Sequence, residues 1–252
     1  MYTRIKTVEE IQNMRKSGKI LAEVHKKLID ALKPGITTKK LAEIAEKEIK
    51  KLGGESAFLG YGAPTPFPDV ICISVNDEVV HGIPSADTTL KDGDIVSLDL
   101  GVIYNGMITD SAISVICGKA DPKVQEFLDI TKKSLFAGLK VIKDGCQVGD
   151  ISFEIQKKLE ANNYGVVRDL VGHGVGHEVH EDPNIPNFGR RKTGPKLVSG
   201  MTLAIEPMST FGNYGVYIKD DGWTVCTNDG SLSAHFEHTI LITDKGCEIL
   251  TA

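Results

Sequence analysis

The segment of residues 172–183 carries three histidines and three carboxylates within twelve positions. Glycine occupies positions 172, 174 and 176, and glycine is tolerated where another group must approach the backbone closely. If the segment is extended, alternation points His173 and His177 to one face and His180 to the other. At least one of the histidines should therefore have a different role. The competing interpretation is a polar, glycine-rich turn with solvated histidines.

Two aspartates lie on neighbouring strands of a predicted hairpin. Residues 94–103 and 108–116 have the apolar pattern of strands, and Asn105-Gly106 between them is a strong hairpin dipeptide. This pairing brings Asp99 and Asp110 close together across the ladder, where two unpaired like charges would be destabilising. A bound cation would turn that repulsion into attraction.

Two glutamates repeat this arrangement in the second half of the chain. Each of the two aspartates is matched by a glutamate later in the chain, and nearby apolar or glycine residues are matched at the same separation. The histidine and proline of residues 81–84 likewise have the spacing of those in residues 180–183. The matching positions are Leu90, Gly93 and Asp99 with Leu197, Gly200 and Glu206, each 107 residues apart, and Asp110 and Ile113 with Glu237 and Ile240, each 127 residues apart. The sequence therefore predicts two similar α/β halves whose strand carboxylates converge near a pseudo-two-fold axis.

Four carboxylates within apolar strands need cations, because burying unpaired carboxylates is very costly. These strands contain no matching set of Arg or Lys. Together with the imidazole of His173, the carboxylates suit two divalent ions, and an oxygen-rich set with one nitrogen favours Mn²⁺, Fe²⁺ or Co²⁺. Two such ions about 3.5–4 Å apart can hold a bridging water, lower its pKa and stabilise a tetrahedral intermediate, which is hydrolytic chemistry. A purely structural metal site is the alternative, and His81 and His180, which lie beyond the ligand set, argue against it.

The elements that must position these residues follow from local patterns. Thr7 and Glu10 form a predicted capping box ahead of a helix that Lys33-Pro34-Gly35 ends. Thr38 is expected to cap a second helix that ends at Gly53-Gly54, and residues 148–160 form its counterpart in the second half. Residues 70–75 form a further predicted strand.

Composition limits the class of protein. The chain has 252 residues, 41% of them hydrophobic, and a net charge of −5, so a nucleic-acid-binding surface is not expected. The basic residues on the first two helices are interpreted as a solvated face. Five scattered cysteines without a C-x-x-C pair indicate reduced thiols in a cytoplasmic protein. The N-terminus is not followed by an apolar signal core, and the apolar runs are too short to span a bilayer.

Several longer motifs surround the candidate residues. They include His81-Gly82-Ile83-Pro84, Gly172-His173-Gly174-Val175-Gly176, Ile205-Glu206-Pro207-Met208, Ser231-Leu232-Ser233-Ala234 and Glu237-His238-Thr239. With them the chain resembles, over nearly its whole length, the type I methionine aminopeptidases of the M24 metallopeptidase family. This resemblance implies an α+β pita-bread fold, with two pseudo-symmetric α/β halves around a central antiparallel sheet. It also implies one catalytic domain over residues 1–252, with an internal pseudo-repeat of roughly 1–118 and 119–252.

The resemblance implies a role for each site residue. Glu206 would take the proton from the bridging water, His81 would contact the scissile amide, and His180 would hydrogen-bond the substrate carbonyl and its oxyanion. The family's metal-ligand positions, for two divalent ions of Mn, Fe(II) or Co, are filled by Asp99, Asp110, His173, Glu206 and Glu237. Its methionine pocket would be lined by Phe58, Tyr61, Cys72, His81, Val179, His180 and Trp223, although Cys72 could equally be an ordinary buried cysteine.

The implied reaction is removal of the initiator methionine from nascent proteins whose second residue is small. The expected partners are nascent polypeptide N-termini. Contact with the ribosome is left open. A cytoplasmic monomer is expected, without a membrane or specific nucleic-acid partner.

Three departures from the family pattern affect these expectations. Val179 replaces the usual phenylalanine and Phe58 replaces a small residue, so we hypothesise that a large side chain has moved from one wall of the pocket to the other. Ile108-Thr109 replaces the glycine preferred ahead of Asp110, which puts the local strand geometry in question. His177 replaces the usual arginine and is interpreted as a surface or loop residue.

Other members of the fold remain as alternatives. Aminopeptidase P and prolidase share the five ligands but usually carry a large extra N-terminal domain. Non-catalytic binding modules of this fold typically lose metal ligands, and none is lost here. The type II aminopeptidases have a helical insertion for which the 25 residues between His180 and Glu206 leave no room.

Overall fold

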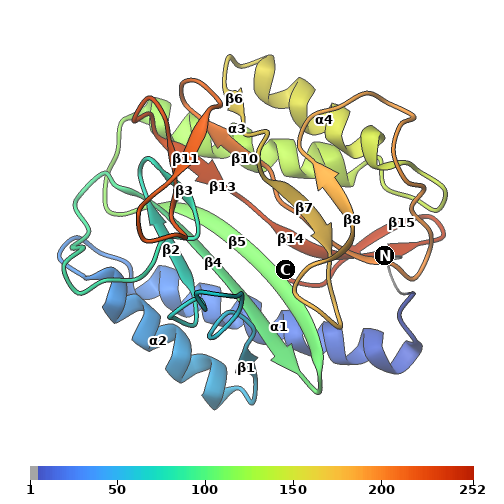
Figure 1. Ribbon diagram of the computed structural model, residues 1–252, viewed down its shortest axis with the longest axis horizontal. Helices are drawn as coiled ribbons and strands as arrows, with labels where there is room; N and C mark the ends of the chain where they lie inside the picture. The colour runs from blue at the N-terminus through green and yellow to red at the C-terminus, as the bar shows by residue number, and fades with distance from the viewer. Residues whose placement is uncertain (1–4) are drawn as a thin grey trace.

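A computed structural model describes residues 5–252, and its helices form two pairs on opposite sides of the strands (Figure 1). In this view α1 (Val8–Ala31) and α2 (Thr38–Lys51) lie along the lower edge, and α3 (Pro122–Leu139) and α4 (Val148–Glu160) along the upper edge. Each pair packs on strands of its own half, and the two halves meet at the centre.

The predicted capping box begins α1. The Thr7 hydroxyl accepts from the Glu10 N–H at 3.3 Å, and the Thr7 N–H donates to the Glu10 carboxylate at 2.7 Å. The prediction for α2 was wrong by one residue, because its cap is Thr37, whose hydroxyl accepts from the Lys40 N–H at 3.2 Å. Thr38 is buried and donates instead to the Ser85 carbonyl, so its hydroxyl is turned towards the neighbouring loop.

Every strand pairing within residues 5–252 is antiparallel, and the strands form four sheets. The first contains β1 (Glu55–Ser56), β4 (Ile95–Tyr104), β2 (Cys72–Val75) and β5 (Met107–Ile116), which pairs with β4. The second has the order β15 (Gly246–Ile249), β14 (His238–Thr243), β9 (Thr202–Ile205), β7 (Val171–Gly174) and β8 (Glu181–Pro186). The two smaller sheets are β13 (Ser233–His235), β10 (Met208–Thr210) and β6 (Gly165–Val166), and β11 (Val216–Ile218), β12 (Val225–Thr227) and β3 (Glu78–Val80).

The β4–β5 hairpin turns at Asn105 and Gly106 as predicted, and both residues have positive φ. Its register places Gly101 opposite Asp110 and Ala112 opposite Asp99, so the two aspartates are diagonal neighbours on one face. Pairing is continuous from Met107 to Ile116, which shows that the missing glycine ahead of Asp110 leaves the strand regular.

Two hydrophobic cores support the two halves. One lies between α1, α2 and the β2–β4 face, around Leu21, Leu41 and Leu98, and the other between α3, α4 and β9–β14, around Phe127, Ile155 and Ile240. This is the mixed α and antiparallel β architecture expected from the sequence. The division of the chain at about residue 118 stays a prediction.

The two large sheets are joined where the acidic residues lie. The Asp110 N–H donates to the Thr239 hydroxyl at 2.8 Å, and that hydroxyl donates to the Asp110 carbonyl at 2.7 Å. The Glu237 N–H donates to the Ala112 carbonyl at 2.9 Å. These bonds tie β5 to the chain entering β14 and fix Asp110 beside Glu237.

Candidate metal centre

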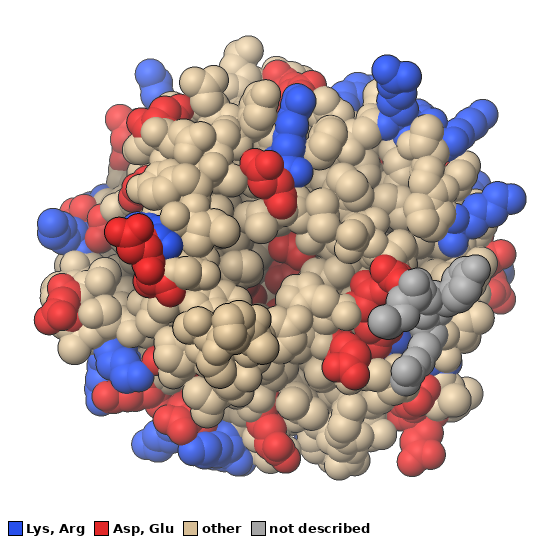
Figure 2. Space-filling view, in the orientation of Figure 1, with Lys and Arg blue, Asp and Glu red and all other residues tan. Residues whose placement is uncertain are grey.

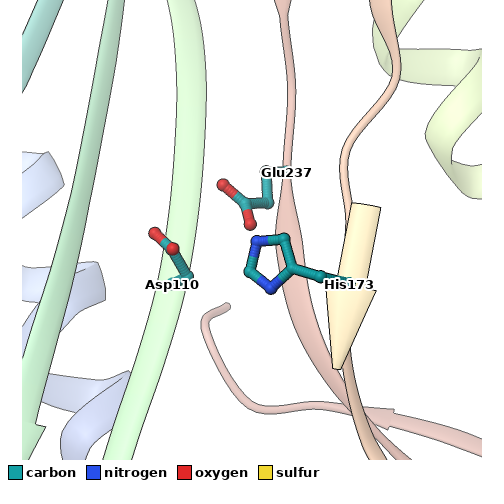
Figure 3. Close-up of side chains that lie close together, drawn as sticks. All are labelled: Asp110, His173 and Glu237. Atoms are coloured by element: carbon teal, nitrogen blue, oxygen red, sulfur yellow. The ribbon is translucent and has the colours of Figure 1, made fainter. Parts of the chain in front are cut away.

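Three side chains from three distant parts of the chain converge between the two halves (Figure 3). Asp110 comes from β5, His173 from β7, and Glu237 from the link between β13 and β14. One ligand atom from each lies within 4.8 Å of the others, which is a geometry that could hold a metal ion. All three residues are buried.

The imidazole of His173 is oriented for ligation. Its Nδ1 lies 2.9 Å from the Gly174 carbonyl, so Nδ1 carries the proton and donates it, and Nε2 presents its lone pair. Burial lowers the pKa of His173 to about 3, which keeps the ring neutral. Nε2 lies 3.3 Å from Glu206 Oε1, and Glu206 directly follows β9.

The carboxylates of this cluster lack the partners that burial demands. Within the described chain, one oxygen each of Asp99, Asp110 and Glu237 is buried without a hydrogen-bond partner. Burial, with the neighbouring carboxylates as a second cause, raises the pKa of Asp99, Glu206 and Glu237 well above the usual range. Burial also raises the pKa of Asp110 to about 7. Unpartnered oxygens and one free imidazole nitrogen fit divalent cations, which would replace the missing partners.

A single cleft contains every residue predicted for the site. Figure 2 shows acidic atoms recessed in a hollow near the centre of the face. The cleft is lined by the five predicted ligands and by all seven predicted pocket residues, together with Phe67. Phe67 was missed because it lies in a proline-rich loop without a periodic pattern. Its ring packs edge-on against Trp223, with centroids 5.3 Å apart.

The walls of the cleft are apolar above the acidic floor. Phe58, Cys72 and Val179 are buried in one cluster with Phe67, and Trp223 packs against it. Cys72 pairs with Asp99 in the β2–β4 register, so the apolar wall directly adjoins the carboxylates. The cleft therefore offers an apolar slot that ends at the candidate metal centre.

Two further histidines enter this cleft. The His180 ring lies 4.2 Å from that of His173, and its Nδ1 lies 2.6 Å from the Tyr61 hydroxyl. His81 adopts a positive φ of 60°, a strained backbone state that clusters at functional sites, and its ring meets Trp223 edge-on. Burial lowers the pKa of both imidazoles, that of His81 to about 4, so both are neutral and able to donate one hydrogen bond.

The expectation that His173 and His177 share a face held only for an extended segment, and the strand does not continue as far as His177. The strand β7 ends at Gly174, and the following turn brings His180 back towards His173. His177 points away from the cleft and bonds to Glu10 at 2.7 Å. It is therefore the histidine with the different role.

His235 is a residue at the site that the sequence did not single out. It is buried, and its Nε2 lies 3.3 Å from Glu206 Oε2. Glu206 thus lies between two imidazoles, those of His173 and His235. The signal available was its position two residues before Glu237, because alternate residues of an extended chain share a face.

Three comparisons with known proteins agree. A family model described as "Metallopeptidase family M24" matches residues 12–244. The chain is 49% identical over 247 residues to a methionine aminopeptidase of Clostridium acetobutylicum, and 47% identical over 246 residues to methionine aminopeptidase 1 of Bacillus subtilis, with 98% of each chain covered in both cases. The crystal structure of a methionine aminopeptidase from Thermotoga maritima superposes with a TM-score of 0.96 at 46% identity, covering 99% of both chains. Across residues 5–252, no helix has the length and apolar character to cross a membrane.

Proposed function

The chain belongs to metallopeptidase family M24, and from this premise we propose that it is a methionine aminopeptidase that removes the N-terminal methionine from polypeptides. It has the pita-bread fold of its relatives. The observation that carries the proposal is the apolar slot between Phe58, Val179 and Trp223, which ends at the carboxylates and at His173. A methionine side chain fits such a slot while its amino and carbonyl groups face the acidic floor.

As a metallopeptidase the protein uses divalent metal. We propose two ions, of Mn, Fe(II) or Co, held by Asp99, Asp110, His173, Glu206 and Glu237. In support, Asp99, Asp110 and Glu237 each have one buried oxygen without a hydrogen-bond partner. When bound, such ions supply Lewis acidity and lower the pKa of a water molecule.

The remaining steps belong to the protein's own groups. Glu206 is the proposed proton acceptor, because its carboxylate lines the cleft and lies 3.3 Å from both His173 and His235. We assign the proton of the 2.6 Å hydrogen bond between Tyr61 and His180 Nδ1 to the Tyr61 hydroxyl. In this tautomer the Nε2–H of His180 can donate to the substrate carbonyl and to the oxyanion that develops there. We propose that His81, which also lines the cleft, contacts the scissile amide.

The finer specificity is also a proposal. We propose nascent chains with a small second residue as substrates, acted on in the cytoplasm by a monomer, with contact to the ribosome left open. Aminopeptidase P or prolidase activity on Xaa-Pro bonds is the second candidate, because those enzymes have a related fold and are expected to share the ligands.

Metal analysis combined with peptide hydrolysis tests the proposal. Purified protein should contain a divalent transition metal and release methionine from Met-Ala peptides faster than from Met-Leu peptides. A chelator should stop the reaction, and Mn²⁺, Fe²⁺ or Co²⁺ should restore it. Cleavage of Ala-Pro peptides in place of Met-Ala peptides would assign the second candidate.

A single substitution tests the role of Glu206. Glu206→Ala should abolish turnover while the far-UV circular dichroism spectrum stays that of the parent protein, because the carboxylate contributes proton transfer and ligation. Retained activity would remove Glu206 from the mechanism.

A further inference from the structure

A buried ion pair joins the N-terminal segment to the turn that carries His180. Lys6 Nζ lies 2.6 Å from Glu181 Oε2, and the two side chains are 0% and 9% exposed. The backbone N–H of Lys6 donates to the Gly200 carbonyl at 3.0 Å, so the segment is anchored on both sides. Breaking a buried pair is strongly destabilising, because it leaves one charge without compensation.

Two glycines leave room for the N-terminal segment of Ile5 and Lys6 to pack against the backbone. A Cβ at Gly176 would lie 2.3 Å from Cε of Lys6, and Gly176 has a φ of 149° that side chains rarely adopt. A Cβ at Gly200 would lie 2.5 Å from Cγ2 of Ile5. The group that approaches the backbone at position 176 is therefore the lysine stem.

Glu181 also organises the turn itself. Its second oxygen, Oε1, accepts from the N–H groups of His177 at 2.6 Å and Glu178 at 3.3 Å. Burial alone would raise the pKa of Glu181, but the hydrogen bond and charge of Lys6, together with the N–H groups of His177 and Glu178, outweigh it, and the net pKa is lowered. The carboxylate is thus ionised and able to hold Lys6 and both amides at once.

A second link reaches the same turn from α1. Nε2 of His177 lies 2.7 Å from Glu10 Oε1, while the other oxygen of Glu10 closes the capping box with Thr7. The turn is therefore fixed to the start of the chain by two acid–base contacts. Its next residues are Val179 and His180, which both line the cleft.

We propose that Lys6 and Glu181 are positioning residues that hold the turn of residues 176–181 so that His180 meets the substrate carbonyl and Val179 completes the slot. This inference rests on the proposed function, because it requires His180 to contact the substrate. Neither residue touches the cleft. Their effect passes through the turn, and small displacements of a catalytic group can cost about 100-fold in rate.

A double-mutant cycle between Glu181 and His180 tests the proposal. Glu181→Gln should lower kcat/KM for a Met-Ala peptide by roughly 10- to 100-fold when His180 is present. In a His180→Ala background the same change should cost several-fold less, because only the positioning of Val179 remains to be lost. Equal losses in both backgrounds would overturn the proposal. If Glu181→Gln does not fold, the cycle is run with Lys6→Met, which keeps the aliphatic stem over Gly176.

A matched control and a measurement without catalysis complete the test. Glu248→Gln breaks the ion pair with Arg15 at 2.6 Å, which also involves α1 but lies away from the turn, and it should leave kcat/KM unchanged. In metal-free protein, hydrogen exchange at the amides of His177 and Glu178 should be faster in Glu181→Gln and unchanged in Glu248→Gln. Unchanged exchange in Glu181→Gln would also overturn the proposal. Absence of methionine release by the parent protein would instead refute the proposed function.

Discussion

The carboxylate cluster should make the metal-free protein less stable than a neutral variant. Asp110 is buried beside Asp99, and one of its oxygens has no hydrogen-bond partner within the described chain. We expect Asp110→Asn, which keeps the shape and removes the charge, to stabilise the metal-free fold at pH 8. Most substitutions of a buried polar residue have the opposite effect.

The size of the effect follows from the pKa of Asp110, which burial raises from 3.8 to about 7. Each tenfold change in proton affinity is worth about 1.4 kcal/mol. The folded protein binds the Asp110 proton more tightly than the unfolded chain does, so stability falls as pH rises between about 4 and 7. Above pH 7 the full penalty of about 4 kcal/mol is present, and below pH 4 it vanishes.

Urea unfolding of chelator-treated protein measures this difference. Asp110→Asn should exceed the parent in free energy of unfolding by up to about 4 kcal/mol at pH 8, and the advantage should shrink at pH 5. Asp69→Asn is the matched control. Asp69 is also buried but lies 2.6 Å from Lys39, so its neutralisation should destabilise the protein.

Added metal should reverse the order of stabilities. Mn²⁺ should raise the stability of the parent by mass action and leave Asp110→Asn nearly unchanged, because a ligand has been lost. If metal-free Asp110→Asn were less stable than the parent at pH 8, the ionised Asp110 carboxylate would already be stabilised by other groups of the protein. The argument that these carboxylates need a cation would then fail.

Two further predictions concern the walls of the cleft. Tyr61→Phe removes the 2.6 Å bond to His180 Nδ1 and should lower kcat/KM for Met-Ala peptides roughly 2- to 12-fold, as expected for a net 0.5–1.5 kcal/mol; activity equal to the parent's would show that His180 is oriented by other contacts. Phe58→Ala should admit bulkier first residues, because the ring fills the space left by Gly101, where a Cβ would meet it at 2.9 Å. Peptide-library selectivity identical to the parent's would refute the hypothesis that Phe58 and Val179 have exchanged large and small side chains between the two walls. In thermal unfolding, the same variant should be less stable by roughly 3–5 kcal/mol, the cost of truncating a buried phenylalanine.

The helices and the β4–β5 hairpin could be predicted because their signals are local. The capping box of Thr7 and Glu10 and the turn at Asn105-Gly106 each lie within a few residues, and hydrogen bonding within that range fixes the backbone. Asp99 and Asp110 could be brought together by the same reasoning, since a hairpin pairs neighbours in sequence. The choice between Thr37 and Thr38 as a cap failed, because packing against the Ser85 loop decided it.

The proposed metal ligands come from both halves of the chain. They could be predicted from the sequence because the acids recur in a repeated pattern and because the family motifs contain them. The pattern named Asp99, Asp110, Glu206 and Glu237 as a group, but it carried no distances. Only the fold shows that Glu206 lies between His173 and His235, and that Asp99, Asp110 and Glu237 each keep a buried oxygen without a hydrogen-bond partner.

The contacts that only the tertiary structure decided are those between residues with no local relation. Lys6 and Glu181 are 175 positions apart, and neither has a pattern that names the other. The turn after β7, which sends His177 to Glu10 and His180 to His173, likewise depends on what packs against it. Sequence fixes elements through interactions within a few residues, whereas side-chain partners across the molecule depend on how those elements pack in three dimensions.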